Sequence, residues 1–404
     1  MRENKSEWFS IPGISILLIF LNGILPLELI VTIQFFLILL MLKRVRIPYS
    51  FLIVFVLVLL QGIVCIMNGN DTVFLFLKQY ISILISVIFW LLCINITSIQ
   101  KLLIMYKQLS LLTSCVAIFQ FIASLVGLNV LANMAWLIKS QGSTPLGRSA
   151  AFLNEPSTCA LVLFPMTFLS LYLYIGKYKD KLKLKISNWQ RITIILGFIT
   201  TGSSSGFIGV TIGLVLMALE YGLNYKEFII LIVGFFILGG IYKSVPLIKE
   251  RMDDTYSLLR GEQSLNSVNV STQTLILNKN VAMDSFKETK GFGGGLGSHQ
   301  ISYSKYISAY SEPNLIYLNQ QDANSMLLRI ISEMGILGLL IAFCFLWFCR
   351  YRKEDKKDLN FKVISLMCLS YILMRFTRFG HYFDCGFFMF VAIYYKCYEI
   401  SKKG

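Results

Sequence analysis

The sequence predicts an all-α polytopic membrane protein with about twelve transmembrane helices. Three observations support this fold class. Of the 404 residues, 56% are hydrophobic and only 15% are charged, whereas about a quarter of the residues in a soluble domain are charged. The apolar residues form runs close to the ~20 residues that a helix needs to cross a bilayer. Short polar segments rich in Lys and Arg separate these runs.

The apolar runs are assigned to helices in order along the chain. Residues 11–42 are too long for one span, and Gly23 and Pro26 favour a tight hairpin of two short helices there. The segment 191–220 is interrupted by TGSSSG and predicts a second hairpin. Single spans are predicted at 49–67, 73–94, 108–130, 155–175, 227–245, 325–349, 360–378 and about 383–397.

The orientation follows from the positions of Lys and Arg, which accumulate in cytoplasmic loops. If the N-terminus is in the cytoplasm, every basic cluster falls on the cytoplasmic side, and the exterior loops keep only scattered basic residues. Both termini are therefore predicted inside. The clusters lie at 43–46, 101–107, 177–185, 350–357 and 402–403.

The spans divide the chain into three predicted parts. An N-terminal membrane bundle of about nine helices covers 1–245, and a C-terminal bundle of about three helices covers 325–404. Between them, 246–324 forms a large extracytoplasmic loop, far longer than an ordinary connection. The helical periodicity of 271–286 (STQTLILNKNVAMDSF) predicts a small folded cap within this loop.

The composition excludes several classes of function. The net charge of +15 could indicate nucleic-acid binding, but the basic residues lie in short loops between spans, so no nucleic-acid partner is expected. The nine cysteines lie in or beside apolar runs and the chain has only two histidines, which excludes a disulfide framework and most zinc patterns. No metal site and no cofactor are expected.

The polar residues that could carry chemistry lie on the predicted exterior side. Arg148 precedes a helix that opens with Glu155 and Pro156. Arg375 and Arg378 share one helix face and suit a pyrophosphate, because a guanidinium is always charged and binds phosphate oxygens bidentately. The exterior candidates for a general base are Asp322, His299 and His381.

Each of these residues also has a purely structural interpretation. Arg375 or Arg378 alone could snorkel to the lipid headgroups, and Glu155 with its proline could simply mark a helix start. Asn324 is a good N-cap. The glycine run at 291–297 is either a backbone nest for anions or a flexible turn.

Three further patterns remain open or weak. Arg329 and Glu333 are i,i+4 neighbours that could neutralise each other. A lone histidine is more often structural than catalytic. GSSSG at 202–206 matches the G-x-S-x-G motif, but that motif needs a strand, a turn and a helix, and here it joins two membrane segments.

In their order along the chain, the motifs resemble those of the Wzy-type polysaccharide polymerases, relatives of the O-antigen ligases among the GT-C-like membrane glycosyltransferases. The chain departs from the family pattern at two positions. Relatives often carry arginine where this chain has Ser205, and His-Asn where it has Ala323-Asn324. The matching stretches are GRSAAFLNEPSTCALVL (147–163), TTGSSSGFIGV (200–210), GFGGGLGS (291–298) and NSMLLRIISEMGILGLL (324–340).

The resemblance implies a bacterial enzyme, multi-pass in the cytoplasmic membrane. Such enzymes join oligosaccharide repeat units carried on undecaprenyl pyrophosphate at the outer membrane face, without a metal or cofactor. Expected partners are membrane lipid, the lipid-linked oligosaccharide, a chain-length regulator and a flippase. The alternatives are an O-antigen ligase and a lipid-linked saccharide flippase. The residues expected to be catalytic are Arg148, Asp322, His299 and Glu333, and those expected to bind substrate are Glu155, Ser204, Asn324, Arg375, Arg378 and His381.

Overall fold

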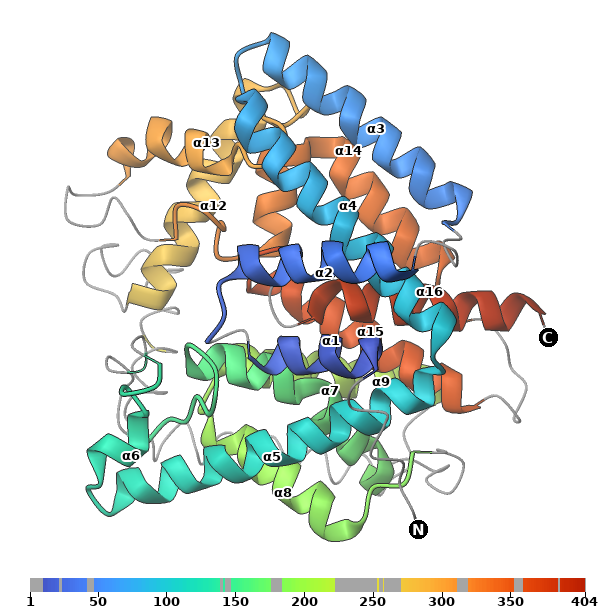
Figure 1. Cartoon of the computed structure of the whole chain (residues 1–404). Coiled ribbons are helices and arrows are strands. Elements are labelled where there is room, and N and C mark those ends of the chain that lie inside the picture. Colours follow the sequence, from blue (N-terminus) through green and yellow to red (C-terminus); the bar gives the residue numbers. More distant parts are fainter. Residues whose placement is uncertain are drawn as a thin grey trace.

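Helices are the only regular elements in the described part of this computed structural model, which confirms the all-α prediction for those residues. Figure 1 shows their arrangement. The structure describes residues 10–21, 24–41, 47–138, 147–175, 184–221, 270–310, 319–351, 359–383 and 386–403, together with Gln141, Asp253 and Ser257.

Most of the helices follow the predicted apolar runs. The exception is α5 (Ile99–Leu125): its predicted span is 108–130, and residues 101–107, predicted as a cytoplasmic loop, lie within this helix. Each of the two long apolar runs divides into two helices as predicted, the first into α1 (Ile11–Phe20) and α2 (Leu27–Met41), the second into α8 (Asn188–Thr200) and α9 (Ser204–Tyr221). The predicted span at 227–245 lies outside the described residues. The other helices are α3 (Tyr49–Met67), α4 (Val73–Ile96), α6 (Asn129–Asn133), α7 (Pro156–Ile175), α12 (Val270–Glu288), α13 (His299–Tyr306), α14 (Met326–Phe348), α15 (Leu359–Thr377) and α16 (Phe387–Lys403). The helices α1 and α2 pack against each other, whereas α8 packs mainly against α5 and α7, and α9 mainly against α15 and α7.

Within the described ranges, six helices are long and apolar enough to cross a membrane: α3, α4, α5, α7, α9 and α14. The helices α1 and α2 are apolar but shorter. These helices agree with a multi-pass membrane protein. The total of twelve spans and the division into three parts remain predictions.

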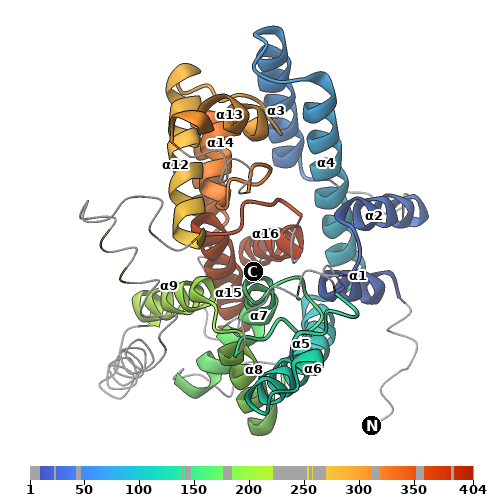
Figure 2. The ribbon, with the colours of Figure 1, turned by 90° about the vertical axis from the view of Figure 1, so that its left-hand side faces the viewer.

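The helix α7 lies at the centre of the bundle and packs against α5, α8, α9 and α15 (Figure 2). Its apolar side chains from Cys159 to Leu169 are almost completely buried. Pro165 lies inside this helix, and such breaks are tolerated where neighbouring helices surround the backbone.

The helix α14 is interrupted at Gly335, whose φ of 57° is left-handed. The glycine run fills this interruption, because the Gly294 and Gly295 amides donate to the carbonyls of Ser332 (2.9 Å) and Glu333 (2.7 Å). A Cβ atom on Gly293 would lie 2.6 Å from the Gly335 nitrogen, so the contact requires glycine. Since those two amides bond within the protein, the run serves here as a packing turn, and the anion-nest interpretation is not supported.

The two ends of the bundle can be distinguished in Figure 1, where α6, α12 and α13 lie on the left and α16 ends on the right. We predict that the α12 side is extracytoplasmic and the α16 end is cytoplasmic, because of the distribution of Lys and Arg. The exposed Lys287 and Lys402 suit a labelling test in a cysteine-free background. A membrane-impermeant thiol reagent on intact cells should label Lys287→Cys and not Lys402→Cys. The reverse pattern would overturn the orientation.

Candidate functional site

A polar cavity of about 420 Å³ lies among the ends of several helices. Two arginines, two carboxylates and a group of serine and threonine hydroxyls line it. The structure therefore brings together residues that are more than 200 positions apart in the sequence. Six residues expected from the sequence to act in catalysis or binding line this cavity: Arg148, Glu155, Ser204, Asp322, Asn324 and Arg378.

The N-terminal ends of four helices face the cavity. Pro156 and Ser157 begin α7, Ser204 begins α9, and Ser271 belongs to the first turn of α12. Asn324 lies two residues before α14. Each helix N-terminus carries a partial positive charge of about half a unit, and such ends are ready-made anion sites. The two arginine and two carboxylate charges cancel formally, so the helix ends make the cavity favourable for an anion.

Arg148 is held at the α8–α9 turn. Its Nε donates to the Thr201 carbonyl at 3.2 Å, and the neighbouring Ser149 amide donates to the Thr200 carbonyl at 3.0 Å. The Arg148 side chain packs against Gly202, where an added Cβ atom would lie 3.3 Å from the arginine Cγ. Gly202 has a φ of 54°. The turn therefore fixes the direction in which the guanidinium enters the cavity.

Glu155 both starts α7 and lines the cavity. Its carbonyl accepts the helical hydrogen bond from the Cys159 amide at 3.1 Å. Its carboxylate accepts the Ser157 hydroxyl at 2.5 Å and the Thr158 hydroxyl at 3.5 Å. The interpretation of Glu155 as a helix start is thus confirmed. Glu155 also lines the cavity.

The two arginines at the end of α15 have different surroundings. Arg378 lines the cavity and donates to the Ser271 carbonyl (3.3 Å) and hydroxyl (3.1 Å), which links α15 to the cap helix α12. Arg375 is fully buried, donates to the His381 carbonyl and lies 5.3 Å from the centre of the Phe387 ring. Their shared helix face therefore does not give them a shared environment, and Arg375 contributes to packing instead of lining the cavity.

Asp322 lies in a tight turn before α14. Its carboxylate accepts the Asn324 amide at 2.9 Å, and both Ala323 and Asn324 have left-handed backbone, with φ of 56° and 54°. Ala323 is completely buried, whereas Asp322 and Asn324 on either side line the cavity. A Cβ atom on Gly380 would lie 1.4 Å from the Asp322 carbonyl oxygen, so only glycine permits this approach.

His299 lies inside the cap and outside the lining of the cavity. It is completely buried, and its Nε2 lies 3.0 Å from the Asn278 side-chain oxygen. The Asn278 amide nitrogen donates to the Thr274 carbonyl, so its oxygen accepts and His299 Nε2 donates. Burial lowers the pKa of His299 to about 3, and the charge of Arg329 contributes. The histidine is therefore neutral at ordinary pH and joins α12 to α13.

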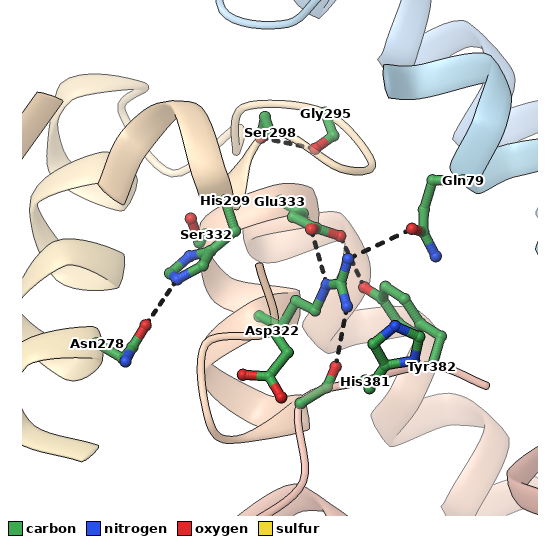
Figure 3. Close-up of polar contacts among 12 residues, drawn as sticks. Gln79, Asn278, Gly295, Ser298, His299, Asp322, Ser332, Glu333, His381 and Tyr382 are labelled. Carbon is green, nitrogen blue, oxygen red and sulfur yellow. Dashed lines mark hydrogen bonds and ion pairs between the residues drawn. The ribbon is translucent and has the colours of Figure 1, made fainter. Parts of the chain in front are cut away.

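Glu333 belongs to a buried network next to the cavity (Figure 3). Its carboxylate accepts Arg329 Nε at 2.8 Å and the Tyr382 hydroxyl at 3.0 Å, and its side chain has no exposed surface. Arg329 also donates to the Gly380 carbonyl at 3.2 Å and to Gln79 at 3.4 Å. The i,i+4 neutralisation is thus confirmed. Glu333 does not line the cavity, although the network fixes Gly380 against Asp322.

His381 also lies outside the residues that line the cavity. Its carbonyl accepts Arg375, and its Nδ1 accepts the Phe383 amide at 3.3 Å. These contacts connect His381 to the end of α15 and to Phe383. Four of the ten expected residues, His299, Glu333, Arg375 and His381, do not line the cavity.

Breaking the network at one partner is expected to destabilise the protein. Arg329→Met leaves a buried carboxylate without its cation, and removing one partner of a buried pair costs about 3–5 kcal/mol. The double variant Arg329→Met with Glu333→Leu should recover much of this loss. Thermal unfolding of the purified proteins and their abundance in the membrane test this. A double variant less stable than the single one would contradict it.

Several lining residues were not identified from the sequence. Ser157, Ser203, Ser271 and Thr274 add hydroxyl groups to the wall, and the Ser203 hydroxyl lies 2.8 Å from that of Ser205. Three of them, Ser157, Ser203 and Ser271, lie at or beside a helix start, and Thr274 lies one turn into α12. Serine and threonine are ordinary at helix starts as caps, so this position alone does not distinguish a binding residue.

Residues 192–343 match the protein-family model Wzy_C, described as O-antigen ligase. No curated protein matches the chain. The matched region contains the cavity residues Ser204, Asp322 and Asn324, whereas Arg148 and Arg378 lie outside it. The resemblance to the Wzy and O-antigen ligase family is therefore confirmed over these residues, and with its apolar helices it indicates a multi-pass membrane protein of surface polysaccharide biosynthesis.

Proposed function

We propose that the protein is a polymerase of surface polysaccharide, a membrane glycosyltransferase that joins repeat units carried on undecaprenyl pyrophosphate. The observation that carries the proposal is the polar cavity. It combines Arg148 and Arg378 with four helix N-termini, which suit a pyrophosphate, and with Glu155 and Asp322, which suit sugar hydroxyls. We place this cavity at the outer face of the bacterial cytoplasmic membrane.

In the proposed reaction, a hydroxyl of one repeat unit attacks the anomeric carbon of the growing chain. The bond from that carbon to the lipid pyrophosphate breaks, and the pyrophosphate leaves with the electron pair. Arg148 and Arg378 stabilise the negative charge that develops on the leaving group, since fixed charges of this kind act in the transition state. Asp322 accepts the proton of the attacking hydroxyl.

The remaining wall would hold the acceptor sugar. The Glu155 carboxylate is already oriented by Ser157, and Ser204 and Asn324 add neutral hydrogen-bonding groups. Carboxylate, hydroxyl and amide groups together match the donors and acceptors of a carbohydrate. A flippase that delivers repeat units and a chain-length regulator are the protein partners consistent with this activity.

An O-antigen ligase would use the same lipid-linked donor and transfer a finished chain to a different acceptor. We favour the polymerase because this chain lacks the His-Asn pair that relatives often carry, and the residue at the histidine place, Ala323, is buried and does not line the cavity. A flippase should carry charged residues at several depths along its central cavity. Lys78 and Glu28, which lie in the apolar helices α4 and α2, instead pair with each other at 3.4 Å, and six of the ten predicted site residues line a single cavity. We therefore favour the polymerase over a flippase.

Deletion of the gene tests the proposal through the banding of surface polysaccharide on a gel. Loss of a polymerase should leave only single repeat units on the final acceptor. Loss of a ligase should instead leave full-length chains on the lipid carrier and none on the acceptor. Full-length lipid-linked chains in the deletion strain would therefore reject the polymerase and favour the ligase.

A further inference from the structure

Two buried glutamines form hydrogen bonds to the segment 147–154, which carries Arg148. Gln120, in the apolar helix α5, and Gln141 are each only 1% exposed. The Gln120 side-chain oxygen accepts the amides of Ala150 (3.1 Å) and Ala151 (2.7 Å), and its amide nitrogen donates to the Gln141 oxygen (3.2 Å). Gln120 thus bonds to the backbone two and three residues after Arg148.

Gln141 completes the arrangement. Its amide nitrogen donates to the carbonyls of Ala151 (2.9 Å) and Leu153 (2.5 Å). Every oxygen accepts and every nitrogen donates, so the orientation of both side-chain amides is determined by their partners. A buried amide without partners is strongly unfavourable next to a membrane span. Replacing either glutamine therefore leaves buried polar groups of the other glutamine and of the backbone without their partner.

The held segment has a backbone that does not form easily by itself. Ala151 has a φ of 50°, a left-handed conformation that is unfavourable for alanine. A third contact from α5 holds the start of the segment, where the Ser124 hydroxyl accepts the Gly147 amide at 2.8 Å. Strained backbone persists where the surrounding structure over-determines it, and it is frequent at functional sites.

We propose that Gln120 and Gln141 are positioning residues that set the place of Arg148 in the cavity. The proposal rests on the proposed function for the role of Arg148. The glutamines bond to the backbone after Arg148, and the Ser124 hydroxyl bonds to the Gly147 amide before it. The carbonyls of Thr200 and Thr201 accept the Ser149 amide and the Arg148 side chain. With both sides fixed, the guanidinium meets the pyrophosphate without reordering the segment.

The chain offers a matched control. Gln34 is also a buried glutamine in an apolar helix, α2, where it accepts the Ser86 hydroxyl at 2.8 Å. It does not line the cavity and does not contact the Arg148 segment. Gln34→Leu therefore removes a buried amide of the same kind without touching the segment.

Hydrogen–deuterium exchange of the full-length protein tests whether the glutamines hold the segment 147–154, and it needs no substrate. In Gln120→Leu the amides of Ala150 and Ala151 lose their acceptor, so a peptide covering 147–154 should exchange at least about tenfold faster. Gln141→Leu provides a second variant should Gln120→Leu not fold, and Gln34→Leu should leave this peptide unchanged. Unchanged exchange in folded Gln120→Leu or Gln141→Leu would overturn the proposal.

Kinetics with an undecaprenyl-pyrophosphate-linked oligosaccharide tests the effect on Arg148. A small displacement of a positioned group can cost about 10²-fold in rate, so we expect that loss in kcat with little change in KM for Gln120→Leu. In an Arg148→Lys background, which keeps a measurable rate, the same change should have a much smaller further effect, because coupled residues are not additive. Additive losses would show that Gln120 acts independently of Arg148.

The two experiments separate the two proposals. Faster exchange in Gln120→Leu together with no polymerase activity in the wild-type protein would mean that the proposed function is wrong, although the glutamines do hold the segment 147–154. An active wild type with unchanged kinetics in Gln120→Leu would mean that the function stands and the positioning role is wrong.

Discussion

Arg148→Lys is expected to lose nearly all polymerisation although it keeps a positive charge. The Nε bond to Thr201 directs the guanidinium into the cavity, and a planar guanidinium can contact two phosphate oxygens at once. A lysine ammonium is a point charge on a flexible stem and does not reproduce this geometry. Removing one such stabilising donor costs about 10²–10³-fold in kcat, and Arg148→Ala should leave no measurable chains.

Arg191 supplies the control for this substitution. Its Nε also donates to a backbone carbonyl, that of Ile186 at 2.9 Å, but it lies in α8 away from the cavity lining. Arg191→Lys should therefore leave chain length unchanged at equal membrane abundance. The measurement is the length distribution of surface polysaccharide in cells that carry each variant. Normal chains from Arg148→Lys would mean that the residue supplies only a general positive field.

Asp322→Asn is expected to reduce the rate by about 10²–10⁴-fold, the usual contribution of a general base. The asparagine oxygen can still accept the Asn324 amide, so the turn before α14 should remain. What is lost is the ability to take the proton of the attacking sugar hydroxyl. Rates of chain extension by the purified protein, compared at matched thermal stability, measure the effect.

His299→Gln is the comparison for Asp322→Asn. The histidine is buried and neutral and bonds to Asn278, so its replacement should affect the packing of the cap and change the rate much less. A severe loss in His299→Gln with near-normal chains in Asp322→Asn would transfer the role of base to the histidine. Normal rates in both variants would mean that leaving-group stabilisation by the arginines is sufficient.

The positions of most membrane helices could be predicted because each depends on a local property, although α5 begins nine residues before the predicted span at 108–130. The run at 49–67 coincides with α3, and the run at 155–175 with α7. A span is recognised from its own apolar residues, since each backbone group in a helix is satisfied within the segment. The left-handed Gly335 that interrupts α14 could not be found in this way, because the apolar run continues across it.

The lining of the cavity was predicted in part. Arg148, Asp322 and Arg378 were identified because a charge at the end of an apolar run is unusual. Sequence spacing could not separate Arg378 from Arg375, since their difference arises from the segment after α15, which folds over Arg375. Gln120 was missed because an uncharged amide in an apolar helix gives little signal, and its partners lie 21 to 31 residues away.

The most direct test of the account is chain extension by the purified full-length protein in lipid vesicles supplied with an undecaprenyl-pyrophosphate-linked repeat unit. The account predicts a ladder of longer oligosaccharides that remain attached to the lipid pyrophosphate, with free undecaprenyl pyrophosphate released at each step and no ladder from Arg148→Ala. Unextended repeat units from the wild-type protein, or a ladder of equal length from Arg148→Ala, would contradict it.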